Sequence, residues 1–458
     1  MPDTKIFLLP LMLEQYDAWI PALRPAQELF LQTVIKFLAH FGAVTNPGIC
    51  TTRNGVEAAI SQAEVEQSDV IIVVLVSYAP SLIAASALAG TKLPVLILNT
   101  TPRAEMGADI ETKDYLENHA IHGVQDLASV LHRAGKPYHV VSGPITDKDL
   151  AAKTADFISA AQATTQWKKL RVGRVGAGFP DMGDFAIDAT TLLLSGPSRI
   201  DIAPAEYQQA WDNAKQASIT ALIAQYQSEY DVSQVGAECL SLTAHAEIAL
   251  RDLVSKYSLD ALAFSFLIFE HLKNSTMPFV GASRLMAEGV GYAGEADALG
   301  ASAVAILQKL TGAAGFTEMF CPDWTRNLVL MSHMGESNPQ FASSRPKMME
   351  KPFLLGGDSK PGVLLFESEP GPVTLASLNL LSKGALCWVV TEGEIVRTPL
   401  YPALDAPHYL FRPEKTLPDF LTAYSEAGGG HHLTICKGRV MHRITLLGEL
   451  MGAEIRSI

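Results

Sequence analysis

The sequence predicts an α/β protein with two Rossmann-like (flavodoxin-like) parallel-sheet domains, followed by a β-rich domain that is an antiparallel sheet or barrel. Three observations favour this class. Apolar runs alternate with helix-spaced segments through the first part and again through the middle of the chain, as in βαβ units. Short strand-like runs separated by Gly and Pro follow residue 315. The length of 458 residues allows two or three domains.

The first domain is expected over residues 1–168. The run DVIIVVLVS is nearly all apolar and rich in β-branched residues, which is typical of a strand buried on both faces. Right-handed connections through helices would join such strands into an open parallel sheet. In order, we predict strand 5–10, a helix with Pro25 near its first turn, helix 54–66, strand 69–77, helix 80–88, strand 93–99, helix 124–134 and strand 138–142.

A polar stretch at 165–171 predicts the first domain boundary, and the second domain is expected over 169–314. It should contain strand 170–175, helical spacing over 205–230 and 237–257, strand 261–267, and helices 280–287 and 297–310. The third domain is expected over 315–458. Its elements are predicted as strands 327–332, 363–367, 373–380, 386–396 and 409–412, with one helix at 418–426.

Composition excludes several classes of protein. The net charge of −13 is not the basic field that a nucleic-acid-binding protein needs. The five cysteines are scattered, odd in number and without a CxxC pair, which argues against a disulfide framework and a structural zinc site. No signal peptide is evident, and no stretch reaches the ~20 apolar residues that span a bilayer. We therefore expect a cytoplasmic protein with no membrane or nucleic-acid partner.

Four segments place side chains that can bind metals beside apolar or glycine-rich runs. Each also has a structural explanation: a solvated turn, an open strand face, a structural histidine or surface histidines. A carboxylate in an apolar strand is costly unless it is paired or bound to a cation. The segments are GVGYAGEAD with Glu295, GFTEMF with Glu318, LVLMSHMGES with His333, and AGGGHHLTI with His431 and His432.

Two glutamates and two histidines make a plausible ligand set for Mn²⁺ or a related first-row ion. The spacings are long, so periodicity alone leaves open whether these residues meet. Adjacent strand residues face opposite ways, so at most one of His431 and His432 is expected to enter a site. Asp297 is expected to serve as the N-cap of the following helix, and its substitution should have a modest effect.

These segments also carry a resemblance to a known family. GYAGEAD, the Glu of GFTEMF, SHMGE and GGGHH occur here in the order and spacing of L-arabinose isomerases, within the L-arabinose isomerase and L-fucose isomerase superfamily. FLLGGDSKPGVLLF resembles the Gly-Gly loop of that family. The likeness is strongest from Pro278 onward and weaker in LENHAIHGVQDL, which contains Asn118 and His122.

The resemblance implies a metal-dependent aldose–ketose isomerase that acts on a sugar through an enediolate or a hydride shift, with Mn²⁺ as cofactor. The implied metal ligands are Glu295, Glu318, His333 and His432. The two glutamates are also the implied catalytic pair. Glu318 is assigned as the base and Glu295 as the acid, and the reverse assignment is left open. His431 would be a neighbour of the metal site. The implied substrate-binding residues are His122, Phe266 and Asn118. The resemblance further implies a homo-oligomer, trimer or hexamer, with sites between subunits.

Departures from the family pattern lie on the substrate side. The loop after the first strand reads PLMLEQY, Ala298 replaces an aromatic residue, and residues 176–184 differ. The sugar is therefore left open. The alternatives are an epimerase or lyase acting on a sugar or sugar acid, a non-catalytic sugar-binding protein, and a glycoside hydrolase, which the two histidines argue against. GRVGAG lacks the order of a dinucleotide-binding loop, which argues against a nicotinamide enzyme.

Overall fold

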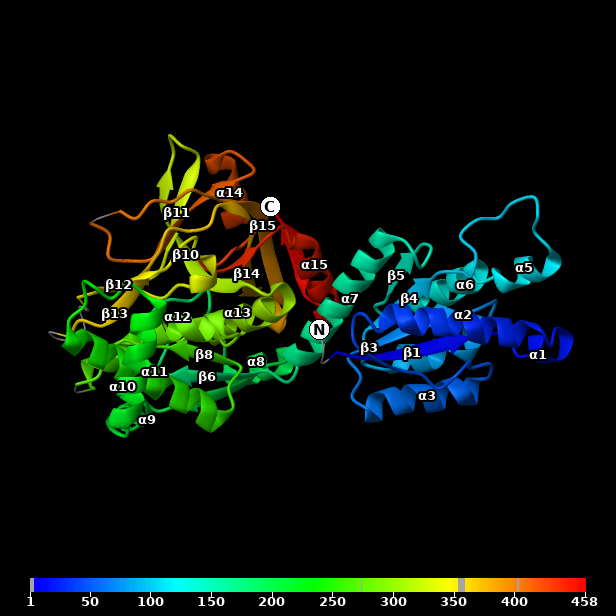
Figure 1. Cartoon of the computed structure of the whole chain (residues 1–458), viewed down its shortest axis with the longest axis horizontal. Helices are drawn as coiled ribbons and strands as arrows, with labels where there is room; N and C mark the ends of the chain where they lie inside the picture. The colour runs from blue at the N-terminus through cyan, green and yellow to red at the C-terminus, as the bar shows by residue number, and fades with distance from the viewer. Residues whose placement is uncertain (1–3, 273, 353–358, 402) are drawn as a thin grey trace. The chain divides into compact units, whose positions relative to one another are not determined.

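The computed structural model describes residues 4–272, 274–352, 359–401 and 403–458. The Gly-Gly loop of the sequence resemblance, at 356–357, lies outside the described residues. The chain divides into two compact units, Met1–Thr165 and Gln166–Ile458. Each unit is described by itself below (Figure 1).

The first unit is a five-stranded parallel sheet in the order β2-β1-β3-β4-β5. Its β3 strand, Val70–Leu75, is buried at every position, as the β-branched run predicts. Helices α3, α4 and α6 share one apolar core with the sheet. The other strands are β1 (Lys5–Leu11), β2 (Ala43–Thr45), β4 (Val95–Asn99) and β5 (His139–Ser142). The helices are α1 (Tyr16–Trp19), α2 (Leu23–Leu38), α3 (Arg53–Val65), α4 (Ala85–Gly90), α5 (Thr112–Glu117), α6 (Ile121–Arg133) and α7 (Lys148–Trp167), with a 3₁₀ turn η1 (Ser81–Ile83).

The second unit begins with a four-stranded parallel sheet in the order β7-β6-β8-β9. Strand β8 ends at Phe264, and the apolar residues that follow form the 3₁₀ helix η2, because a short apolar run does not distinguish strand from helix. The helical stretch expected over 205–230 is two helices, α9 and α10. The elements are β6 (Arg171–Val175), α8 (Ala189–Ser195), β7 (Ser198–Ile202), α9 (Pro204–Asp212), α10 (Gln216–Glu229), α11 (Ala237–Tyr257), β8 (Ala261–Phe264), η2 (Phe266–Glu270), α12 (Phe279–Ala287), β9 (Gly291–Ala293) and α13 (Ala298–Thr311).

A closed antiparallel barrel follows in the same unit. Six strands run in the order β14-β17-β10-β11-β16-β15, and pairing of β14 with β15 closes the ring, while β18 adds to β15 in parallel. The predicted fold class, two parallel-sheet regions and a β-rich C-terminal region, is confirmed. The elements are β10 (Ala314–Asp323), β11 (Leu328–Ser332), η3 (Pro339–Phe341), β12 (Lys347–Glu350), β13 (Gly362–Leu365), β14 (Gly371–Leu380), η4 (Ser382–Gly384), β15 (Leu386–Val396), β16 (His408–Pro413), α14 (Leu417–Glu426), β17 (His432–Lys437), α15 (Met441–Met451) and β18 (Glu454–Ser457).

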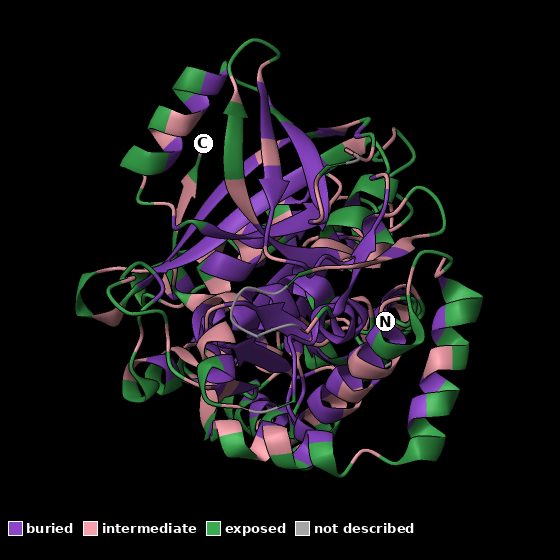
Figure 2. Ribbon diagram, turned by 90° about the vertical axis from the view of Figure 1, so that its left-hand side faces the viewer, coloured by how far each residue is buried: buried purple, intermediate pink, exposed green. Residues whose placement is uncertain are grey.

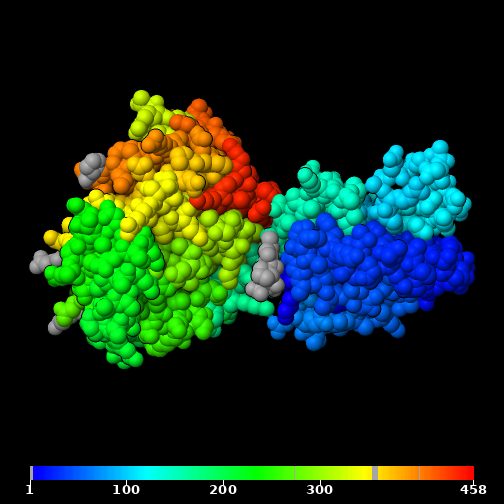
Figure 3. Space-filling model, viewed as in Figure 1, coloured from blue at the N-terminus to red at the C-terminus, as the bar shows by residue number. Residues whose placement is uncertain are grey.

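Helix α13 joins the parallel sheet to the barrel. It packs on β8 and β9 on one side and on β10 and β17 on the other, and nearly all of its residues are buried. Figure 2 shows the buried strands at the centre of this unit. In the space-filling view the residues before and after 315, green and yellow to red, form one continuous body (Figure 3). Across the described residues, no helix combines the length and apolar character that a bilayer crossing requires.

Candidate metal centre

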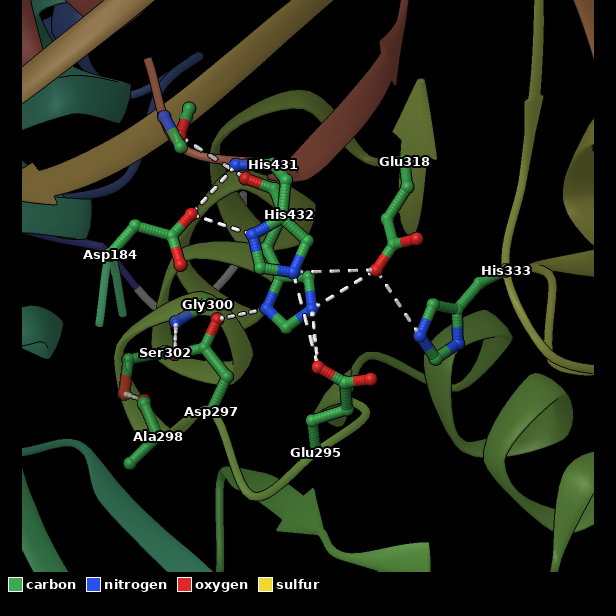
Figure 4. A network of polar contacts seen from close by, with 12 residues as sticks. Asp184, Glu295, Asp297, Ala298, Gly300, Ser302, Glu318, His333, His431 and His432 are labelled. Atoms are coloured by element: carbon green, nitrogen blue, oxygen red, sulfur yellow. Dashed lines mark hydrogen bonds and ion pairs between the residues drawn. The ribbon is translucent and has the colours of Figure 1, made fainter. Parts of the chain in front are cut away.

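Four of the side chains singled out in the sequence meet beside α13 (Figure 4). Glu318 on β10 pairs directly across the ladder with His432 on β17, and His432 Nε2 lies 3.1 Å from Glu318 Oε1. His333 follows β11, the other neighbour of β10, and its Nε2 lies 3.4 Å from the same oxygen. Glu295 comes from the turn before α13, with Oε2 3.6 Å from His432 Nε2. Two glutamates and two histidines therefore face one small space.

An unusual backbone turn aims Glu295 at this space. Glu295 and Ala296 adopt φ values of 55° and 59°, a left-handed conformation that costs a non-glycine residue roughly 1–2 kcal/mol. Gly294 must be glycine, because a Cβ there would lie 2.5 Å from His333 Cε1. Backbone held in this conformation by its surroundings is characteristic of functional sites.

Each buried imidazole is held by a carboxylate behind it. Asp297 Oδ2 lies 2.8 Å from His432 Nδ1, and Glu336 Oε1 lies 2.7 Å from His333 Nδ1. Because each Nδ1 contacts a carboxylate, Nε2 is the nitrogen that each ring directs at the glutamates. Carboxylate–histidine pairs of this kind orient and strengthen metal-binding histidines.

The structure corrects one expectation about Asp297. It is the N-cap of α13, as predicted, since its Oδ1 accepts a hydrogen bond from the Gly300 N–H at 2.8 Å. The sequence assigned it to the cap with a modest effect of substitution, but its second oxygen also holds His432. Sequence reasoning also missed Glu336, which lies three residues after His333 and is almost fully buried. The sequence carries no signal for this contact, because an acidic residue in a loop is ordinarily solvated.

A second correction concerns His431. Strand alternation predicts that only one of the two adjacent histidines faces the site, but β17 begins at His432, so His431 precedes the strand. Its Nε2 lies 3.9 Å from Glu295 Oε2 and 3.8 Å from Glu318 Oε1. Its Nδ1 is held by Asp184 Oδ2 at 2.6 Å. Both histidines therefore face the glutamates.

The electrostatics of the pocket favour positive charge among the carboxylates. Burial opposes ionisation of Glu295, but the imidazoles of His431 and His432 beside it lower its pKa to about 2. Burial likewise opposes protonation of His432, yet the hydrogen bond with Asp297 and the nearby carboxylates of Glu295 and Glu318 raise its pKa to about 11. The carboxylates thus require positive charge nearby, which either imidazole protons or a cation can supply.

The donor set fits a divalent cation. In two groups of three residues the ligand atoms all lie within 4.8 Å of one another. The groups are Glu295 with His431 and His432, and Glu318 with His333 and His432. Glu295 Oε2 and His432 Nε2 are buried without a hydrogen-bond partner in the described part of the chain. A buried polar atom without a partner costs about 1–3 kcal/mol, and a cation between these atoms would satisfy both.

Two of the three expected substrate-binding residues lie in the first unit. Asn118 is buried, and its side chain accepts from the Arg103 N–H at 2.8 Å and donates to Asp114 O at 2.7 Å, so it holds a loop. His122 is exposed on α6, with its ring centroid 4.9 Å from that of Tyr78. Their contacts with a substrate stay predictions.

The third, Phe266, begins η2 in the second unit, and its ring packs 5.7 Å from that of Phe179. Its contact with a substrate also stays a prediction. A cavity of about 350 Å³ lies beside the loop between β6 and α8, which carries Phe179. Phe179, Met182, Phe185 and Ala298 form part of its lining. Ala298, which replaces an aromatic residue of the family, is therefore at the cavity wall.

Comparison with known proteins identifies the family. The L-arabinose isomerase central domain matches residues 200–313, and the L-arabinose isomerase C-terminal domain matches residues 313–454. Together the two domains span more than half of the chain. The chain belongs to the L-arabinose isomerase family. The resemblance in the sequence motifs is thereby confirmed, and so is the predicted enzyme class, an aldose–ketose isomerase.

Individual L-arabinose isomerases match along most of their length. L-arabinose isomerase 1 of Bacillus licheniformis is 25% identical over 435 residues, 92% of this chain and 86% of its own. The L-arabinose isomerase of a Nocardioides species is 26% identical over 431 residues, 90% of this chain and 85% of its own. That of a Thermotoga species is 27% identical over 380 residues, 79% of this chain and 75% of its own.

One solved structure aligns over 67% of this chain and 92% of its own chain. It is a periplasmic solute-binding protein of an ABC transporter from Actinobacillus succinogenes, with bound D-allose. Its TM-score is 0.18 and its identity 10%, values too low to indicate a shared fold.

Proposed function

We propose that this member of the family converts L-arabinose to its 2-ketose, L-ribulose, with Mn²⁺ held by Glu295, Glu318, His333 and His432. One observation carries the proposal: buried atoms of Glu295 and His432 that make no hydrogen bond face the same space as Glu318 and His333. Carboxylate and imidazole donors together suit Mn²⁺ or a related first-row ion. The choice of L-arabinose follows the relatives, which are L-arabinose isomerases over most of this chain.

When bound, the cation would polarise the carbonyl group of the sugar. Asp297 and Glu336 keep the two histidines oriented for this role through their contacts at Nδ1. The buried walls of the pocket, among them the ring of Phe316 against both histidines, keep bulk water from the imidazoles. Exclusion of water strengthens every charge interaction within the site.

The protein's own carboxylates move the proton. In the proposed direction, Glu318 removes the proton from C2 of the open-chain aldose while Glu295 supplies a proton to the carbonyl oxygen on C1. Glu318 then returns its proton to C1, and Glu295 takes a proton from the hydroxyl on C2, so that both groups end as they began. The exchanged assignment of the two glutamates balances equally, and it agrees with the lowered pKa of Glu295, which keeps that carboxylate ionised and able to accept a proton.

A hydride shift would place the same residues around the sugar but use no base at C2. The two routes differ in heavy water. Proton transfer through Glu318 places deuterium on C1 of the ketose to the extent that the proton exchanges with solvent while Glu318 holds it, whereas a hydride shift places none there. Deuterium on C1, measured by mass spectrometry of the ketose formed in heavy water, would therefore establish proton transfer.

The function is tested by screening aldoses with the chelator-treated protein, with and without Mn²⁺. L-arabinose should yield L-ribulose only when the cation is present, and His432→Gln should yield none. Other pentoses, hexoses and deoxy sugars in the same screen establish the range of substrates. The absence of ketose from every aldose in the presence of Mn²⁺ would contradict the proposal, and formation of an epimeric aldose alone would indicate an epimerase.

A further inference from the structure

We propose that His431 binds the sugar substrate, outside the set of metal ligands, and that Asp184 is the positioning residue that holds His431 for this contact. The inference rests on the proposed function and deepens it. It concerns two residues that are 247 positions apart in the chain, one in the loop between β6 and α8 and the other just before β17.

Asp184 holds residue 431 at two points. Its Oδ2 lies 2.6 Å from Nδ1 of the His431 ring and also accepts the backbone N–H of His431 at 2.9 Å (Figure 4). The loop that carries Asp184 is itself anchored, because the next residue, Phe185, stacks on His432 with ring centroids 4.7 Å apart and 12° between the planes. The ring of His431 is therefore fixed, with Nε2 as its one nitrogen left for a ligand.

Exposure separates His431 from the other two histidines. The side chain of His431 is 39% exposed, whereas those of His333 and His432 are 4% exposed. Among the side chains of this site, the buried atoms without a hydrogen-bond partner are Glu295 Oε2 and His432 Nε2. A cation that satisfies those atoms does not need His431, which lies on the side of the pocket open to solvent.

A molecule that enters from solvent would meet Nε2 of His431 beside the two glutamates. Sugar hydroxyl groups both donate and accept hydrogen bonds, so they match a ring nitrogen in either protonation state. The distances of 3.8 and 3.9 Å from this nitrogen to the Glu318 and Glu295 oxygens place it next to the atoms proposed to transfer the proton. A contact here would fix the reacting end of the sugar.

The competing explanation is that His431 is a further metal ligand, since its ring nitrogen also lies near those of Glu295 and His432. The two explanations differ in what is lost when the imidazole is removed. A substrate-binding residue affects affinity for sugar, and a ligand affects affinity for metal.

The test compares His431→Gln, Asp184→Asn and His432→Gln with the wild type. Asp181→Asn is the matched control, since Asp181 lies in the same loop, is exposed, and has a positive φ that Asn tolerates. Calorimetry measures the affinity for Mn²⁺ and, on the Mn²⁺-loaded protein, the affinity for L-arabinitol, an open-chain polyol that cannot isomerise. Steady-state kinetics then separate KM from kcat, and circular dichroism confirms folding.

His431→Gln and Asp184→Asn should retain Mn²⁺ affinity, bind L-arabinitol about 3- to 10-fold more weakly, as expected for a lost hydrogen bond, and show a raised KM. Asp181→Asn should match the wild type. If His431→Gln weakens Mn²⁺ binding as much as His432→Gln does, or leaves polyol affinity and KM unchanged, the inference is wrong. If only Asp184→Asn is without effect, Asp184 is not the positioning residue. Failure of the wild type to bind Mn²⁺ would instead overturn the proposed function.

Discussion

Asp297 holds His432 with one carboxylate oxygen, 2.8 Å from the ring Nδ1, and caps helix α13 with the other. One side chain thus fixes both the start of the helix beside the site and the orientation of an imidazole. The double role makes the two effects of a substitution separable. Asparagine is a good helix cap, but its one amide oxygen cannot accept from both the Gly300 N–H and the ring N–H of His432.

Asp297→Asn should lower the affinity for Mn²⁺ by about 10–100-fold while the protein stays folded. If the amide oxygen caps the helix, the amide nitrogen faces Nδ1, and the ring then carries its proton on Nε2, where the metal should bind. Calorimetric titration with Mn²⁺ measures the effect, and the melting temperature checks the fold. Unchanged affinity would show that the contact with His432 has no part in metal binding.

Glu318→Gln should reduce turnover by at least about 10²–10⁴-fold, because glutamine keeps the shape of the side chain but cannot take a proton. Loss of a metal ligand should add to this. The control is Glu394→Gln on β15, which removes an exposed ion pair with Arg412, and such pairs contribute little. Rates at saturating Mn²⁺ test the prediction, and more than about a tenth of wild-type turnover would exclude Glu318 as the base.

A divalent cation should stabilise the fold by binding only the native state. At a concentration a hundred times its Kd, the expected gain is about 2.7 kcal/mol in the free energy of unfolding. Thermal melts with chelator and with added Mn²⁺ measure the shift, and His432→Gln should show none. Identical melting curves with chelator and Mn²⁺ would contradict a metal site.

The apparent affinity for Mn²⁺ should rise with pH. Hydrogen bonds with its carboxylate neighbours raise the pKa of His432 to about 11 against the effect of burial, so near neutral pH the ring carries a proton that metal binding must displace. Each displaced proton raises the apparent affinity about tenfold per pH unit. Titrations at several pH values, in buffers of different ionisation enthalpy, count the protons released on Mn²⁺ binding. An affinity for Mn²⁺ that does not change with pH would show that binding displaces no proton from His432.

The protein should assemble as a trimer or hexamer, with His122 of one subunit serving the site of another. Light scattering gives the mass, and a strictly monomeric, fully active protein would contradict the prediction. Mixing provides a sharper test. If His122→Gln and Glu318→Gln are each inactive, mixed assemblies should regain activity, because some sites would then combine an intact His122 with an intact Glu318.

Local patterns predicted the elements well where one periodicity dominates. The β-branched run of β3 and the helical spacing of α11 gave strand and helix within a residue or two of the observed bounds. Helix α7 was missed because its apolar face is weak and its end reads as a polar linker. Closure of the barrel through β14 and β15 depends on pairing between strands, which no local pattern encodes.

In the candidate metal centre too, local motifs identified residues, but only the fold shows which of them meet. Glu295, Glu318, His333 and His432 were named from motifs, yet only the ladder registers and the turn before α13 bring them together. Glu336 and Asp184 could not be assigned as histidine partners from sequence, because an isolated acidic residue in a loop is ordinarily solvated. For Asp184 the partner lies 247 positions away.

The direct pairing of Glu318 with His432 across β10 and β17 has a consequence for which changes of chain length this protein can accept. A residue inserted between 314 and 318, or between 432 and 436, shifts one strand by a single place and turns one of the two side chains to the opposite face of the barrel wall. The same insertion in the hairpin beyond Asp323 leaves the pair in place. Natural variation in length should therefore collect in the hairpin ends and be absent from these two short stretches.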